Sequence, residues 1–174
     1  VIIAPFLPIL IKYFGKKKLT IYSSFITIAL CFIQYFVGYE NFIVFLVLSA
    51  IRVLFMQIPL LIYGMFTADC IEYGAYINGE RTEGIAFSVQ TLVTKLSGAI
   101  CSTICLMLLG RFGYVQQAVE QTERALHGIW IILTLVPAIG YSIMLLAMVF
   151  YKLDEETVKN FIQNNLSQEW GADN

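Results

Sequence analysis

The chain has 174 residues, of which 59% are hydrophobic and 13% charged, and its formal net charge is −1. Its mean hydropathy is +0.76. Soluble domains average about 45–50% apolar and about 25% charged residues, and a short chain cannot hide such an apolar excess in its core. Composition therefore excludes an ordinary soluble domain and indicates a membrane protein, and we expect no nucleic-acid partner.

Apolar runs long enough to cross a bilayer recur along the chain. A spanning helix needs about 20 mostly apolar residues. Residues 1–14 form a shorter apolar run, and we expect them to be the end of an earlier span whose upstream part is missing. Four longer windows follow, at 19–39, 42–68, 84–110 and 128–151. They predict an all-α polytopic helical bundle.

Basic residues are unevenly distributed between the two sides of this bundle. Lys and Arg stay preferentially on the cytoplasmic side. If the basic loop at 16–18 is cytoplasmic, the C-terminus is cytoplasmic too. That side then carries Lys12, Lys16, Lys17, Lys18, Arg81, Lys152 and Lys159, and the other side carries Arg111 and Arg124.

Lys95 lies near the middle of the third span. A charge there costs about 2.5–3.5 kcal/mol or more on insertion scales. Thr91 shares its face one turn away, and Gln90 and Thr94 lie beside them. Lys95 either neutralises a carboxylate that holds helices together or lines an ion or substrate pathway, and the surrounding polar stripe favours the pathway. No Asp or Glu lies deep in any predicted span, so a counter-ion must come from elsewhere.

The second span contains a charge and a helix-bending residue. Arg52 has no polar stripe around it, so helix packing, snorkelling and transport are all open interpretations. Pro59 removes a backbone hydrogen bond, and Gly64 follows five residues later. Membrane helices tolerate Pro, so this is either simple tolerance or a hinge in a helix that moves.

We expect the polar segment 69–83, which follows that span, to be a loop. Asp69 and Glu72 are spaced to share a helix face, and Asn-Gly at 78–79 is a turn signal. Arg81 can then return towards the two carboxylates and form a directional ion pair. The segment is either a gate network or an ordinary solvated loop, in which exposed pairs contribute little.

Enzyme chemistry is not expected. The sequence has no nucleotide-binding glycine loop, no metal-spaced His or Cys cluster and no Ser/His/Asp set. We therefore predict no catalytic residue, no metal site and no cofactor. The cysteines are interpreted as packing residues.

Three motifs follow one another along the chain. Residues 69–74 read Asp-Cys-Ile-Glu-Tyr-Gly, residues 79–84 read Gly-Glu-Arg-Thr-Glu-Gly, and residues 87–95 read Phe-Ser-Val-Gln-Thr-Leu-Val-Thr-Lys. In this order they resemble the glycoside–pentoside–hexuronide:cation symporter (melibiose permease-like) family of the major facilitator superfamily. The resemblance implies that residues 1–152 run from the end of helix eight to helix twelve of a twelve-helix fold. Residues 153–174 would be a cytoplasmic tail.

The resemblance also implies symport of a sugar or glycoside with Na⁺, Li⁺ or H⁺ across the cell membrane. These cations are co-substrates rather than cofactors, and the bilayer and the missing N-terminal half are the expected partners. Lys95 matches a lysine near the acidic cation site of the first half, and Gln90 and Thr91 match polar residues close to the sugar and cation. The cytoplasmic charge network of the family is matched by Asp69, Glu72 and Arg81.

The chain departs from the family pattern at a few positions. Ala75 stands where an acidic residue is common, and Leu60 and Tyr63 stand where some relatives place an aromatic near the sugar. Related carriers for lipids and sulfonates keep the substrate open. A non-transporting four-span membrane subunit remains the alternative from another class.

Overall fold

The computed structural model of this chain describes residues 3–38, 41–80, 82–118, 120–151, 157–158, 160 and 163. In this part of the chain every regular element is helical. A 3-10 turn, η1 (Ala4–Phe6), leads into a short helix, α1 (Leu7–Phe14). The long helices α2 (Lys16–Val37), α3 (Phe42–Asn78), α4 (Glu83–Arg111) and α5 (Glu123–Phe150) follow. Each of these four is long and apolar enough to cross a membrane, which confirms the predicted fold class.

Local sequence explains where the long helices begin and end. The Asn41 side chain accepts hydrogen bonds from the backbone N–H groups of Ile43 and Val44 at the start of α3, at 3.2 and 3.4 Å. Thr122 accepts one from the N–H of Ala125 at the start of α5, at 3.3 Å. Both are favoured N-cap residues because they satisfy N–H groups that have no partner within the helix. Gly79 ends α3 in the left-handed conformation, with φ 72°, which glycine adopts without a steric penalty.

Helix α3 is longer than the apolar run that predicts it. It continues through the polar residues after position 68 and ends at Asn78, so the prediction of a loop beginning at Asp69 is wrong for its first ten residues. Hydropathy marks where a chain leaves the hydrocarbon, whereas a helix ends where its backbone is capped. The Asn-Gly turn signal at 78–79 correctly locates that cap. At about 1.5 Å per residue, α3 extends well beyond a bilayer core of about 30 Å.

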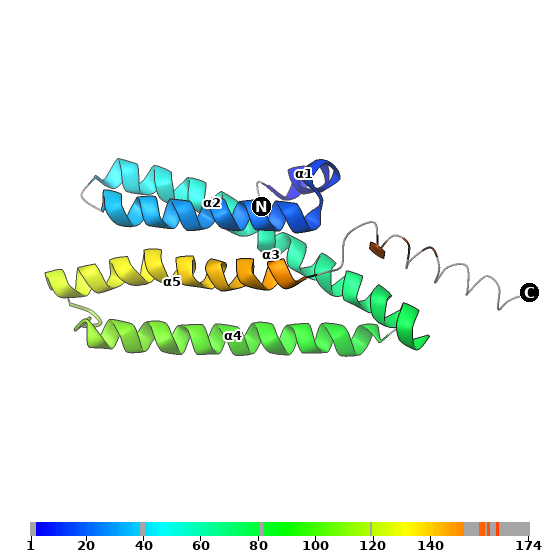
Figure 1. Ribbon diagram of the computed structural model, residues 1–174. Coiled ribbons are helices and arrows are strands. Elements are labelled where there is room, and N and C mark those ends of the chain that lie inside the picture. Colours follow the sequence, from blue (N-terminus) through cyan, green and yellow to red (C-terminus); the bar gives the residue numbers. More distant parts are fainter. Residues whose placement is uncertain are drawn as a thin grey trace, which may run out of the picture.

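Helix α2 lies between α3 and α5 and packs closely against both, while α4 makes only light contact with α3 and α5. Figure 1 shows α4 along the lower edge of the molecule, beside α5. The buried face of α2 consists largely of small polar residues. Such residues allow membrane helices to approach closely. They are Thr20, Ser23, Ser24, Thr27 and Cys31, with Gln34 at the far end.

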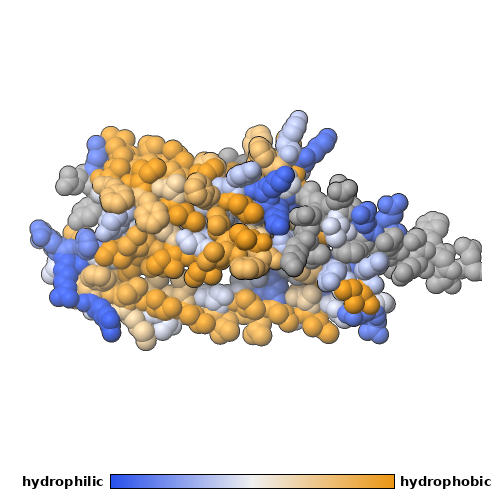
Figure 2. Space-filling model, viewed as in Figure 1, coloured by the Kyte–Doolittle hydropathy of each residue, from blue (hydrophilic) through white to orange (hydrophobic). Residues whose placement is uncertain are grey.

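The surface of the helices is largely apolar. In Figure 2 hydrophobic residues cover the middle of the molecule, and hydrophilic residues gather towards its ends. A small core of Leu7, Leu19, Ile58, Ile62 and Phe66 joins α1, α2 and α3. No residue of α4 is buried. Lipid, or further protein outside this chain, must therefore cover most of the apolar surface.

Candidate functional site

The polar stripe of α4 is exposed along the helix. The Thr91 hydroxyl donates to the carbonyl of Phe87 and the Thr94 hydroxyl to that of Gln90, both at 2.8 Å. These bonds satisfy each hydroxyl proton within the helix. The hydroxyl oxygens keep acceptor capacity, so the stripe can offer oxygen ligands to a cation or a sugar hydroxyl.

Lys95 is exposed, and no described side chain forms an ion pair or hydrogen bond with it. Gln90 is half-buried, on the side of α4 that faces the rest of the bundle, whereas Lys95 and Thr91 are exposed. At 100° per residue, Lys95 and Thr91 lie about a third of a turn away from that side. Thr91 and Lys95 therefore lie on a surface of α4 that the described part of the bundle leaves open, whereas Gln90 lies at its edge towards the bundle.

A buried ion pair joins the start of α2 to α3. The Lys16 Nζ lies 2.6 Å from both carboxylate oxygens of Asp69. The two side chains are only 15% and 10% exposed. A charge-assisted bond to both oxygens in such surroundings is stronger than a surface ion pair.

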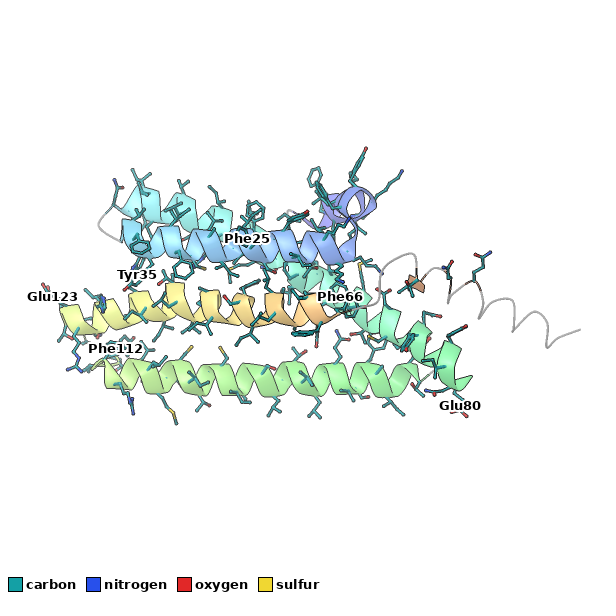
Figure 3. The ribbon with its side chains drawn as sticks, in the orientation of Figure 1. Phe25, Tyr35, Phe66, Glu80, Phe112 and Glu123 are labelled. Atoms are coloured by element: carbon teal, nitrogen blue, oxygen red, sulfur yellow. The ribbon has the colours of Figure 1, made fainter. Side chains whose placement is uncertain are left out.

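The position of Lys16 explains why a carboxylate is needed there. Lys16, Lys17 and Lys18 occupy the first turn of α2, where the helix dipole disfavours positive charge. Asp69 supplies the negative charge that this turn lacks. Next to Asp69 in α3, the ring of Phe66 packs edge-on against Tyr151 at the end of α5, with ring centroids 5.1 Å apart. Figure 3 shows Phe66 beside that end of α5. The ion pair therefore lies where α2, α3 and α5 meet.

The structure describes two of the three residues of the predicted charge network. Asp69 and Glu72 lie on α3, and Arg81 lies outside the described residues, so its pairing stays a prediction. Sequence reasoning missed Lys16 as the partner of Asp69 because it used the lysine run only to orient the chain. The available signal was three lysines at a helix start with no acidic residue in the first turn.

The remaining candidates lie inside α3. Pro59 is buried, and a side chain at Gly64 would meet open space, so no close packing fixes Gly64 as a glycine. Arg52 is 6% exposed, and its guanidinium Nη1 donates to the backbone carbonyl of Leu133 in α5 at 2.8 Å. Of the three interpretations of Arg52, the structure shows packing against another helix.

These features define a class: an α-helical, multi-span membrane protein with a polar stripe on one open helix and a charged junction at one end of the bundle. Residues 1–155 match the family model described as MFS/sugar transport protein. The chain belongs to this family of the major facilitator superfamily. Its relatives are of the glycoside–pentoside–hexuronide type, and they are transporters rather than enzymes.

The relatives show how much of such a protein is present. The chain is 34% identical over 160 residues to the uncharacterized symporter YjmB of Bacillus subtilis, covering 91% of this chain and 34% of that protein. It is 30% identical to the glucuronide carrier protein homolog of Escherichia coli, covering 91% of this chain and 35% of that protein. It is 33% identical to the isoprimeverose transporter of Lactiplantibacillus pentosus over 51% of this chain and 18% of that protein. The chain thus spans about a third of the length of the first two.

Proposed function

We propose that the complete protein is a secondary active transporter that couples entry of a sugar or glycoside to Na⁺ or H⁺ by alternating access. The observation that carries this proposal is the polar stripe around Lys95, on a helix that the described bundle leaves exposed. A lysine near mid-membrane needs a water-filled cavity or a carboxylate partner. The remainder of a full-length protein is the natural source of both, since related transporters bind substrate between two halves.

The ion pair of Lys16 and Asp69 supports a gate at one end of the transporter. We infer that this end, with the basic turn of α2, faces the cytoplasm, because Lys and Arg accumulate there. An ion pair at a helix junction stabilises one packing of α2 against α3. Breaking it in one conformation and forming it in the other would bias the two states.

The first test is uptake of a labelled panel of sugars and glycosides by the full-length protein in membrane vesicles, with and without a Na⁺ or H⁺ gradient. We expect gradient-driven accumulation of at least one sugar. Lys95→Ala should lower the rate about tenfold or more, which corresponds to about 1.4 kcal/mol. Leu92→Ala, at an exposed apolar position of the same helix, is the matched control and should transport like the wild type.

Each other outcome of this test has a meaning. Accumulation that is equal in Lys95→Ala and wild type would remove Lys95 from the coupling site. No accumulation under either gradient would remove the sugar symporter, and the panel would then be extended to sulfonates and lipids. If sugars, sulfonates and lipids all fail to accumulate, the result would favour a membrane subunit that does not transport alone.

A further inference from the structure

Two prolines interrupt the backbone hydrogen bonding of the helices α3 and α5. Pro59 lies inside α3 and Pro137 inside α5. Proline has no N–H, so the carbonyl four residues earlier loses its helical partner. The two carbonyls are those of Phe55 and Leu133. The hydrocarbon offers no water to replace the lost bond, so neighbouring groups must satisfy the freed oxygen.

Arg52 of α3 satisfies the carbonyl that Pro137 leaves free. Its guanidinium Nη1 donates to the Leu133 oxygen at 2.8 Å. The Nε of Arg52 is buried without a partner, and among the described residues no carboxylate pairs with its charge. The guanidinium also lies against the thiol of Cys31 in α2. The closest strong acceptor for this buried arginine is therefore a backbone oxygen that exists as a free acceptor only because of a proline.

Tyr141 of α5 makes the converse bond to α3. Its hydroxyl donates to the carbonyl of Met56 at 2.9 Å. The carbonyl freed by Pro59 is that of Phe55, and Met56 is the next residue in the chain. Tyr141 therefore bonds beside the break in α3, whereas Arg52 bonds directly at the break in α5.

The packing around these two bonds explains why side chains, and not close backbones, connect α3 with α5. The backbones of α3 and α5 come close at few points, since α2 packs against both. A cavity of about 330 Å³ adjoins the contact of Tyr141 with Met56 and reaches Pro137, and it is lined by these residues, Gly140 and Cys101 of α4. A change of the bend at Pro137 would alter this space and hence the position of α4 relative to α5.

We propose that Arg52 is a positioning residue that holds the proline break of α5 against α3, and that the bond from Tyr141 to α3 supports it. Together they fix the bend of α5 relative to α3, so that α3 and α5 move as one unit. The proposal goes beyond the transport function, because it concerns the coupling of two helices and holds whatever the substrate is.

A double-mutant cycle on the purified full-length protein tests the pairing, with the thermal midpoint Tm as the measurement. Arg52→Met removes the donor, and we expect Tm to fall by about 4 °C. Pro137→Ala restores the N–H that the Leu133 carbonyl needs. In that background the fall caused by Arg52→Met should shrink by half or more, because the carbonyl is already satisfied.

The mismatched combination is the control. Arg52→Met with Pro59→Ala should show additive changes in Tm, since Pro59 frees the carbonyl of Phe55 and not that of Leu133. A fall of equal size in both backgrounds, or no fall in either, overturns the proposal. If Arg52→Met alone gives no folded protein, recovery of folded protein in Arg52→Met/Pro137→Ala supports it, and failure to recover overturns it.

Discussion

At the residue scale, the ion pair of Lys16 and Asp69 combines two effects in one contact. Asp69 neutralises a lysine that is only 15% exposed, and it places a negative charge at the start of α2. Removal of one member of a buried pair leaves the other as an uncompensated charge, which costs more than the pair itself contributes. The two residues are 53 positions apart, so no local pattern predicts their contact.

The first prediction follows from this contact. Asp69→Asn removes the carboxylate that bonds Lys16 at the start of α2, and we expect a loss of about 3 kcal/mol of stability. The exchange Lys16→Asp with Asp69→Lys should recover part of that loss, because the carboxylate then lies at the positive end of the α2 dipole. Thermal unfolding of the full-length protein measures both.

Glu80→Gln is the control for this prediction, since Glu80 is an exposed carboxylate beyond the end of α3. It should leave the thermal midpoint unchanged. An exchange variant that is no more stable than Asp69→Asn would contradict a direct pair between positions 16 and 69.

At the element scale, the sequence predicts the existence and approximate place of the four spans, because a run of about 20 apolar residues is a strong signal. It predicts helix ends less well. α3 extends past Asp69 and α5 begins at Glu123, before the apolar window at 128. Both differences arise because caps such as Gly79 and Thr122, and not hydropathy, end or begin a helix.

In the candidate site, too, some features could be predicted from the sequence and others could not. The stripe around Lys95 could be predicted because its members are neighbours on one helix. The contacts of Asp69 with Lys16, and of Arg52 with Leu133, join different helices. They depend on how α2, α3 and α5 pack, which a single sequence does not specify.

The junction of α4 and α5 gives the next prediction. Gly128 of α5 is buried directly against the ring of Phe112 at the end of α4, so that a Cβ at position 128 would overlap the ring. Figure 3 shows Phe112 close to the start of α5. Gly128→Leu should therefore destabilise the protein by about 1–3 kcal/mol through overpacking.

The measurement is again the thermal midpoint of the full-length protein. Phe112→Ala in the same chain makes room for the new side chain and should restore part of the loss. Gly140→Leu is the matched control, because a Cβ there meets nothing within 4 Å. Equal losses for the two glycine variants would show that the ring of Phe112 is not the cause.

At the scale of the whole molecule, the outstanding feature is the openness of α4. None of its most apolar window is buried, compared with 33% for α2. An apolar helix with a lysine and several hydroxyl groups is poorly suited to lipid on every side. We therefore expect one side of α4 to border a water-accessible cavity and the other to face lipid or protein.

Cysteine labelling tests this expectation in the full-length protein in membranes, after replacement of its native cysteines. A membrane-impermeant maleimide should label Thr91→Cys and Lys95→Cys at least about tenfold faster than Ile100→Cys. Thiolates react only where water reaches them, and Ile100 is an exposed apolar residue on the opposite side of the same helix. Equal labelling at all three positions, or none at any of them, would contradict a cavity along the stripe.

The polar face of α2 has a consequence for biosynthesis. The hydroxyl groups of Thr20, Ser23, Ser24 and Thr27 all donate to carbonyls of α2 itself. These four hydroxyl groups are therefore already satisfied when α2 enters the lipid, before α3 and α4 are synthesised. The side chains of Gln34 and Arg52 have no acceptor in their own helix, because they donate to Ser49 and to Leu133 on other helices. Helix α5, which is synthesised after α3, thus completes the hydrogen bonding of Arg52 in α3.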